Sequence, residues 1–186
     1  MLRMIQWPRK LFTEDNLNPL EILLLLIAVG MAVKKYRLFD RAFMRGDVKV
    51  WLVDATGART LAFEKKNLIV RNGKTIMAKL LGGDASYKNL EHISTIAFGT
   101  SSTAATDTQT NLIAQQFSKA ATVDYPAYNQ VRFSATMDAA EGGSYTYQEL
   151  GLKSAATGIL FSRIVIAAIT KSTSYKIQVE WTISLQ

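Results

Sequence analysis

The sequence has no cysteine, a single histidine and three prolines among its 186 residues. Without cysteine the chain forms neither a disulfide framework nor a thiolate metal site, and cysteine usage says nothing about the redox compartment. His92 has no second histidine with which to share a metal, and no Gly-x-Ser-x-Gly turn offers a serine nucleophile. We therefore expect a protein that is not an enzyme, with no catalytic residues, no cofactor and no metal.

Acidic residues are in the minority, with 15 against 22 basic residues, and the formal net charge is +7. A basic chain attracts nucleic acid, anionic lipid or an acidic partner. Here part of the excess flanks an N-terminal apolar run, and the rest is scattered singly along the chain. No cluster of lysine and arginine alternates with aromatic residues, as a nucleic-acid groove requires. We expect no dedicated nucleic-acid site.

Residues 1–47 differ in character from the rest of the chain, and we interpret them as a helical anchor or docking segment. Asn18 can cap a helix, Pro19 suits its first position, and Glu21 favours the N-terminal end of the helix dipole. The apolar pattern continues along one helical face as far as Met44. We predict an N-terminal apolar α-helix whose assembly or membrane anchor consists of Leu20, Ile22, Leu23, Leu24, Leu25, Leu26, Ile27, Val29 and Val33.

Four interpretations of this apolar segment stay open. Residues 20–33 are shorter than the roughly 20 apolar residues of a membrane span, so they would cross a bilayer only with tilt or thinning, anchored by Trp7 and Tyr36. The run also has the length of a secretory signal, although acidic residues precede it. It equally fits a helix buried against partner subunits, since a helix that is apolar all round is buried somewhere. A translation start at Met31 or Met44 would place the run outside the functional protein.

Residues 48–186 show a hydrophobic pattern with a period of two, which is typical of half-buried strands. Residues 60–70 form one predicted strand, and Asn72-Gly73 after it is a strong turn signal. Residues 74–81 share a helical face and precede a glycine pair, which predicts a short helix. With about eight strands and only short helices, this part of the chain is predicted to be an all-β domain, an antiparallel β-sandwich of jelly-roll-like type.

Tyrosines recur on the expected strands and turns of this domain. Exposed aromatic rings can form a platform for carbohydrate, whereas amphipathic rings on strands are also ordinary half-buried residues. Both interpretations stay open for the predicted surface interaction set, which consists of Tyr125, Tyr128, Tyr145 and Tyr147.

Three carboxylates invite comparison with the paired acids of glycoside hydrolases. Asp138 and Glu141 lie at a predicted hairpin turn, where acids are ordinary, so we do not assign them to catalysis. Glu149 is followed by apolar residues, which predicts that its carboxylate is partly buried and needs an arginine or lysine partner, with Arg132 and Arg163 as candidates. The loop of residues 100–108 has small side chains, many hydroxyls and one charge, so it is predicted to be a connector rather than a catalytic loop.

Motifs along the second part of the chain are similar to those of a known family. They are the turn Asn72-Gly73, a strand ending in Phe98-Gly99-Thr100, the strand Phe133-Ser134-Ala135-Thr136, the segment Glu149-Leu150-Gly151-Leu152 and Trp181-Thr182-Ile183 near the C-terminus. In this order they resemble a module common in structural proteins of tailed bacteriophages, the tail-fibre and minor virion proteins, over about residues 48–186. The chain departs from the family where Gly99-Thr100-Ser101-Ser102 replaces its repeated Gly-Thr, and residues 1–47 do not match it.

The resemblance implies a non-enzymatic component of the virion. We therefore expect a structural protein of the tail, of fibre attachment or of capsid decoration, located in the virion. It would act through assembly with other virion proteins and as a homo-oligomer, and membrane contact through residues 20–33 stays open. The alternative is a membrane-anchored β-sandwich module that binds carbohydrate or a host surface.

Overall fold

The computed structural model describes residues 44–90, 92–154 and 156–185, which belong to one compact unit, Phe43–Gln186. The predicted apolar helix, with its anchoring residues at 20–33, lies outside the described residues, so it stays a prediction. Neither helix among the described residues has the length and hydropathy that crossing a membrane requires.

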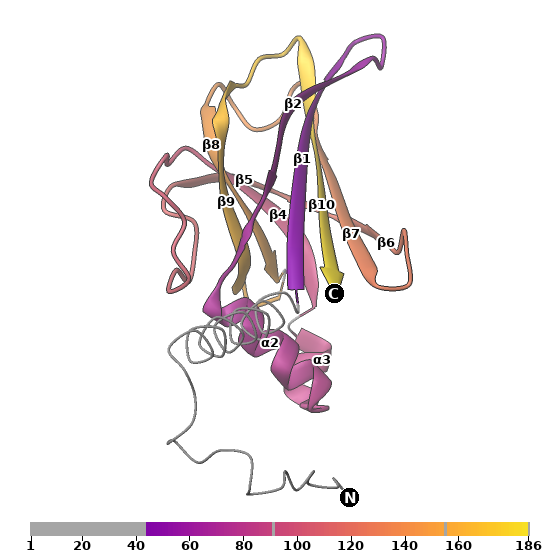
Figure 1. The fold of residues 1–186 in the computed structure, drawn as a ribbon. Coiled ribbons are helices and arrows are strands. Elements are labelled where there is room, and N and C mark those ends of the chain that lie inside the picture. Colours follow the sequence, from indigo (N-terminus) through magenta and orange to yellow (C-terminus); the bar gives the residue numbers. More distant parts are fainter. Residues whose placement is uncertain (1–43, 91, 155, 186) are drawn as a thin grey trace, which may run out of the picture. The chain divides into compact units, whose positions relative to one another are not determined.

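The described strands form two antiparallel sheets of five strands each (Figure 1). The first sheet has the order β2-β1-β10-β7-β6, and the second has the order β3-β9-β8-β4-β5. The predicted all-β antiparallel sandwich is confirmed, although its described part contains ten strands instead of about eight. The strands are β1 (Met44–Asp54), β2 (Arg59–Lys66), β3 (Leu68–Ile69), β4 (Ile93–Gly99), β5 (Gln115–Ala120), β6 (Thr122–Asp124), β7 (Gln130–Met137), β8 (Thr146–Ser154), β9 (Leu160–Thr170) and β10 (Tyr175–Leu185).

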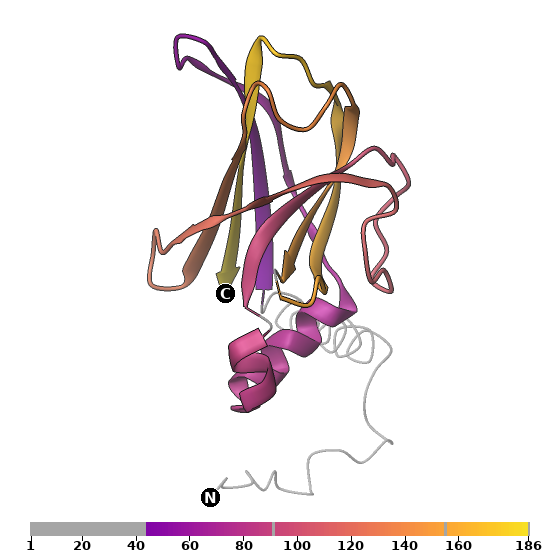
Figure 2. The ribbon, with the colours of Figure 1, turned by 180° about the vertical axis from the view of Figure 1, so that it is seen from behind.

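At two places a single residue carries the chain directly from a strand of one sheet into a strand of the other. Each of these places divides a continuous extended segment into two strands, which contributes to the larger number of strands. The predicted strand of residues 60–70 is divided at Asn67 into β2, at the edge of the first sheet, and β3, at the edge of the second. At the opposite edges, Ala121 separates β5 in the second sheet from β6 in the first. The Asn67 amide donates to the Gly46 carbonyl at 3.0 Å, and the Ala121 amide donates to the Ser94 carbonyl at 2.8 Å. The backbone therefore links the two sheets along both sides (Figures 1 and 2).

The first strand begins earlier than the hydrophobic pattern indicates. The predicted helical face that reaches Met44 is wrong at that residue, because Met44 is paired with Leu185 in β10. This antiparallel pairing runs without a shift from Met44 to Asp54, which pairs with Tyr175. Backbone hydrogen bonds to a strand far away in the sequence decide the structure here, and local periodicity does not reveal them.

Two helices lie at one end of the sandwich, α2 (Arg71–Leu81) and α3 (Ala85–Leu90) (Figure 1). The turn predicted at Asn72-Gly73 is wrong, because both residues lie in the first turn of α2. Gly73 is buried, and a Cβ atom on it would lie 2.2 Å from the carbonyl oxygen of Phe161 in β9. The glycine therefore allows the helix to approach the strand closely.

One hydrophobic core fills the space between the sheets. Val50 of β1, Val179 of β10 and Trp181 of β10 contribute to it from the first sheet. Phe98 of β4 and Leu150 of β8 contribute from the second sheet. Because the inner faces of both sheets pack into the same cluster, the two sheets form one structural unit.

Candidate functional site

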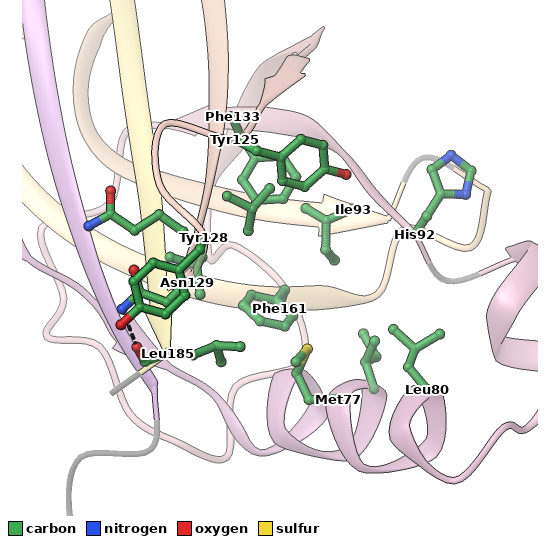
Figure 3. A pocket seen from close by; sticks show the side chains of 14 residues that line it. Met77, Leu80, His92, Ile93, Tyr125, Tyr128, Asn129, Phe133, Phe161 and Leu185 are labelled. Atoms are coloured by element: carbon green, nitrogen blue, oxygen red, sulfur yellow. Dashed lines mark hydrogen bonds between the residues drawn. The ribbon is translucent and has the colours of Figure 1, made fainter.

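The end of the sandwich that carries α2 contains an apolar hollow of about 280 Å³ (Figure 3). Met77 and Leu80 of α2 line it from one side. Phe161 of β9, Ile93 of β4 and Leu185 of β10 line it from the strands. Residues far apart in the sequence thus form one apolar hollow because their strands and helix end at the same place.

Exposed aromatic side chains stand beside this apolar hollow. Tyr125 and Tyr128, on the turn between β6 and β7, belong to its lining and are 78% and 102% exposed. Leu80 and Leu185, which also line it, are 37% and 40% exposed. Exposed apolar side chains scattered singly are normal, whereas a contiguous group of them marks a site of interaction.

Among the residues that the structure describes, the lining of the apolar hollow contains no aspartate, glutamate, lysine or arginine, although the chain as a whole carries a net charge of +7. The side-chain amide of Asn129 donates to the Leu185 carbonyl at 2.7 Å, so it already has a partner (Figure 3). His92, which precedes β4, is an exposed residue of the lining. The arrangement suits a neutral apolar group and offers no pair of side chains for acid–base catalysis.

The four tyrosines predicted as one surface set do not form one surface. Tyr125 and Tyr128 precede β7, whereas Tyr145 follows it. The eight residues of this strand separate them by roughly 25 Å, at about 3.3 Å per residue. Of the four, only Tyr125 and Tyr128 belong to the lining of the apolar hollow.

Tyr147 is 1% exposed, so its predicted place on the surface is wrong. Its ring packs edge-on against Phe98 with 5.7 Å between the ring centroids, and its hydroxyl donates to the Gly142 carbonyl. Burial raises the pKa of Tyr147 to about 12. In a regular strand, Tyr147 and Glu149 would lie on the same face of the sheet because they are two residues apart. The pairing of β8 with β9 shifts register between them, and this irregularity interrupts the regular alternation.

The three carboxylates that suggested a hydrolase do not converge. The Lys119 ammonium lies 2.5 Å from Glu141 and 3.9 Å from Asp138, and Lys176 lies 3.0 Å from Asp138. Hydrogen bonds from these lysines lower the pKa of both carboxyl groups, Lys176 acting on Asp138 and Lys119 on Glu141. A general acid needs a raised pKa, so neither group is suited to that role. In the described ranges, no three histidine, aspartate or glutamate side chains gather in a way that could hold a metal ion.

Glu149 is fully buried and forms an ion pair with Arg163, which is fully buried as well. The Arg163 Nε atom donates to Glu149 Oε2 at 2.8 Å, and Nη2 lies 2.7 Å from that oxygen without the alignment of a hydrogen bond. The prediction of a buried carboxylate with an arginine partner is confirmed for Arg163. Arg132 instead pairs with Asp124 at 2.7 Å. With its oxygens occupied by donors, Glu149 is a structural acceptor rather than a free base.

Sequence patterns missed the apolar hollow, although they placed most of its members on apolar faces. The alternation within β9 and β10 indicates that Phe161 and Leu185 belong to strands, but not that these strands meet α2 at one end. The signal that could have found the site is a set of aromatic residues, Tyr125 and Tyr128, on a turn next to a proline. Turns are usually polar, so apolar rings there indicate a contact surface.

Comparisons of the chain with protein-family models, with curated proteins and with solved structures found no match.

Proposed function

We propose that this chain is a non-enzymatic structural protein of a tailed-bacteriophage virion, which works by assembling with other virion proteins and with copies of itself. The observation that carries the assembly role is the apolar hollow beside the exposed rings of Tyr125 and Tyr128. The carboxylates that could have formed a hydrolytic site are instead held by lysines or by Arg163. The virion setting comes from the motif resemblance of residues 48–186.

The occupant of the apolar hollow would be an apolar side chain of a neighbouring protein subunit. The described lining has no carboxylate, ammonium or guanidinium group, so an acidic group entering it would lose hydration without a lysine or arginine partner there. The exposed tyrosines would supply large contact area while keeping their hydroxyl groups in water, as aromatic residues at protein interfaces do. The jelly-roll-like connection of the strands, the apolar helix at residues 20–33 and the virion location are further parts of this proposal.

Sedimentation velocity of the full chain over a concentration series tests the assembly role. We expect self-association that Tyr128→Ser weakens at least tenfold, because the ring that is most exposed in the monomer loses its contact area. Tyr145→Ser is the matched control, since Tyr145 is exposed at the other end of β7 and should leave association unchanged. A wild-type chain that stays monomeric at every concentration would contradict self-assembly, and incorporation into purified particles would then be tested.

The second candidate is a membrane-anchored module that binds carbohydrate or a host surface. The exposed rings of Tyr125 and Tyr128, only three residues apart, favour it because sugars stack on aromatic rings. A glycan array probed with the wild-type chain and with Tyr128→Ser distinguishes the two functions. Glycan retention that the substitution abolishes, with sedimentation unchanged, would favour this candidate over assembly.

A further inference from the structure

Residues 100–114, which we call the strap, connect β4 to β5 without forming a helix or strand. Leu112 is the one buried side chain of the strap, and most of the others are exposed. It packs with Val70, Ala97 and Leu160 in a small cluster that is separate from the core between the sheets. The strap therefore covers a part of the second sheet that does not face the main core.

Buried charges hold the strap in place. Glu149 accepts hydrogen bonds from two consecutive strap amides, Ala114 at 2.7 Å and Ile113 at 3.2 Å. Its partner Arg163 donates in addition to the side-chain carbonyl of Gln109 at 3.1 Å. The ion pair thus binds the strap at two places, and it does so from strands β8 and β9 beneath it.

A second buried cation also holds the strap against the sheet. Lys153 of β8 is 8% exposed, and its ammonium donates to Asn111 at 2.7 Å and to Gln115 at 2.9 Å. Asn111 belongs to the strap, and Gln115 is the first residue of the strand that follows it. Charge-assisted hydrogen bonds of this kind fix geometry more strongly than neutral ones.

Two glycines make room for the strap on the sheet. A Cβ atom on Gly151 would lie 2.1 Å from Cδ1 of Leu112, so the leucine rests directly on the backbone of β8. A Cβ atom on Gly99 would lie 2.4 Å from the Glu149 carboxylate and 2.7 Å from the Ala114 carbonyl oxygen. The surface of the second sheet on which the strap rests, which we call its seat, therefore includes Gly99 and Gly151. The strap fits there because these two positions have no side chain.

The backbone contributes little to this attachment. Among the described residues, one backbone hydrogen bond outside the sheet pairing joins the strap to another element, from the Arg71 amide to the Asp107 carbonyl at 2.7 Å. The others are internal, from Thr100 to Ala114 and from Gln109 to Thr106. The strap can consequently leave its seat without breaking the strand pairing of either sheet.

We propose that the strap opens as a unit while both sheets stay folded, and that Glu149 and Arg163 are the latch that keeps it closed. Opening uncovers the seat at Gly151 and the ion pair on the outer side of the second sheet. Such partial opening is expected where a segment has few buried apolar contacts and is held by a small number of polar ones. The inference goes beyond the assembly role, and it stands if that role fails.

Native-state hydrogen exchange of the full chain tests whether the strap opens separately. The amides of Ile113 and Ala114 report on the strap, and those of Leu150 and Val179 report on the two sheets. We expect the strap amides to exchange at least tenfold faster than the sheet amides, with a weaker dependence on added denaturant. Equal rates and equal denaturant dependence at the four amides would overturn the proposal, because the strap would then open only on global unfolding.

Two substitutions test the same proposal by the change in exchange rate at each amide, so that the rates of different amides need not be compared with one another. Val179→Ala destabilises the core, so it should speed exchange of the Leu150 amide and leave Ile113 and Ala114 unchanged. Leu112→Ala destabilises the closed strap, which is part of the native state, so it should speed exchange at both the strap and the sheets. Faster exchange of the strap amides in Val179→Ala would contradict separate opening.

The latch is tested without leaving a buried charge wholly unpaired. Gln109→Ala removes the bond from Arg163 to the strap, and with it the bond that the same Gln109 oxygen accepts from the Thr106 amide at 3.0 Å, but it retains the Glu149–Arg163 pair. It should speed exchange of Ile113 and Ala114 at least about fivefold, because each lost hydrogen bond favours the open strap. Thr108→Ala is the control, because the Thr108 side chain is exposed and its hydroxyl contacts that of Thr106, which also belongs to the strap. Unchanged strap exchange in Gln109→Ala would overturn the assignment of the latch.

Discussion

At the scale of single residues, Glu149 explains how this protein accommodates a charge in its interior. A buried carboxylate without partners is strongly destabilising, and a buried pair gains little over an apolar pair of the same shape. Here the carboxylate has donors from Arg163, Ile113 and Ala114, so its charge is compensated. The pair is better understood as defining where residues 100–114 lie than as a source of net stability.

Tyr147 gives the protein a pH-dependent stability above pH 10. Its pKa is 10.0 when unperturbed and about 12 in the folded chain, so the unfolded chain releases this proton first and stability falls between these values as the pH rises. Tyr147→Phe should remove this part of the fall. At neutral pH it should lower the free energy of unfolding by about 1 kcal/mol, because the hydrogen bond to Gly142 is lost.

Urea unfolding at neutral pH and at points between the two pKa values measures both effects of Tyr147→Phe. Tyr128→Phe is the control, since the Tyr128 ring is fully exposed and the substitution should change neither quantity. An unchanged pH dependence in Tyr147→Phe would mean that another group causes the fall.

The sequence predicts part of this residue-level chemistry. The apolar residues after Glu149 correctly indicate that its carboxylate leaves the solvent and needs a basic partner, although the burial is complete rather than partial. They do not decide between Arg132 and Arg163, because that choice depends on Gly151 and Arg163 lying opposite one another in the pairing of β8 with β9. The surface position predicted for Tyr147 is wrong for a related reason. The register shift after Tyr147 cannot be recognised from the alternation of side chains in the sequence.

At the scale of elements, the position of α2 depends on Gly73. Gly73→Ala should improve intrinsic helix propensity by about 1 kcal/mol. The new methyl group would however lie 2.2 Å from a backbone oxygen of β9, which cannot move as a flexible side chain can. We expect a net loss of about 2 kcal/mol in the free energy of unfolding, because overpacking outweighs propensity.

Thermal and urea unfolding of the full chain measure the effect of Gly73→Ala. Gly82→Ala is the matched control at the end of the same helix, where the backbone has φ −75° and a Cβ atom would lie 3.4 Å from the Ala78 carbonyl oxygen. It should leave stability unchanged or raise it slightly. A Gly73→Ala chain as stable as the wild type would show that the helix can move away from β9.

Element types were largely predictable, whereas their assignment to sheets was not. Alternating residues in 48–186 correctly indicate strands, and the helical face of residues 74–81 correctly predicts most of α2. The division of residues 60–70 at Asn67 could not be foreseen, because it depends on which strand pairs with each part, β1 with β2 and β9 with β3. The Asn72-Gly73 signal failed because close packing uses the same residue as a tight turn.

At the scale of the whole molecule, one core makes the two sheets interdependent. Trp181 is fully buried within it, and we expect Trp181→Leu to lower the free energy of unfolding by about 3 kcal/mol through lost contacts and a residual cavity. Trp51→Leu is the control, because Trp51 is only partly buried and lies beneath the Arg59 guanidinium, 4.4 Å from its ring centroid. It should change stability by less than about 1 kcal/mol.

Far-UV circular dichroism in urea follows both tryptophan substitutions without depending on tryptophan fluorescence. Because the core is shared, a single transition with a lower midpoint is expected for Trp181→Leu. Two separate transitions would contradict the view that the sheets form one unit.

The contact between Leu112 and the bare backbone at Gly151 has an evolutionary consequence. A side chain at position 151 would overlap Cδ1 of Leu112, 2.1 Å from its Cβ atom, unless the leucine moves or is replaced by a smaller residue. In the same way, the acid at position 149 and the guanidinium at position 163 can be lost only together without stranding a charge. Diverged homologues that keep this architecture are therefore expected to covary at 112 with 151 and at 149 with 163.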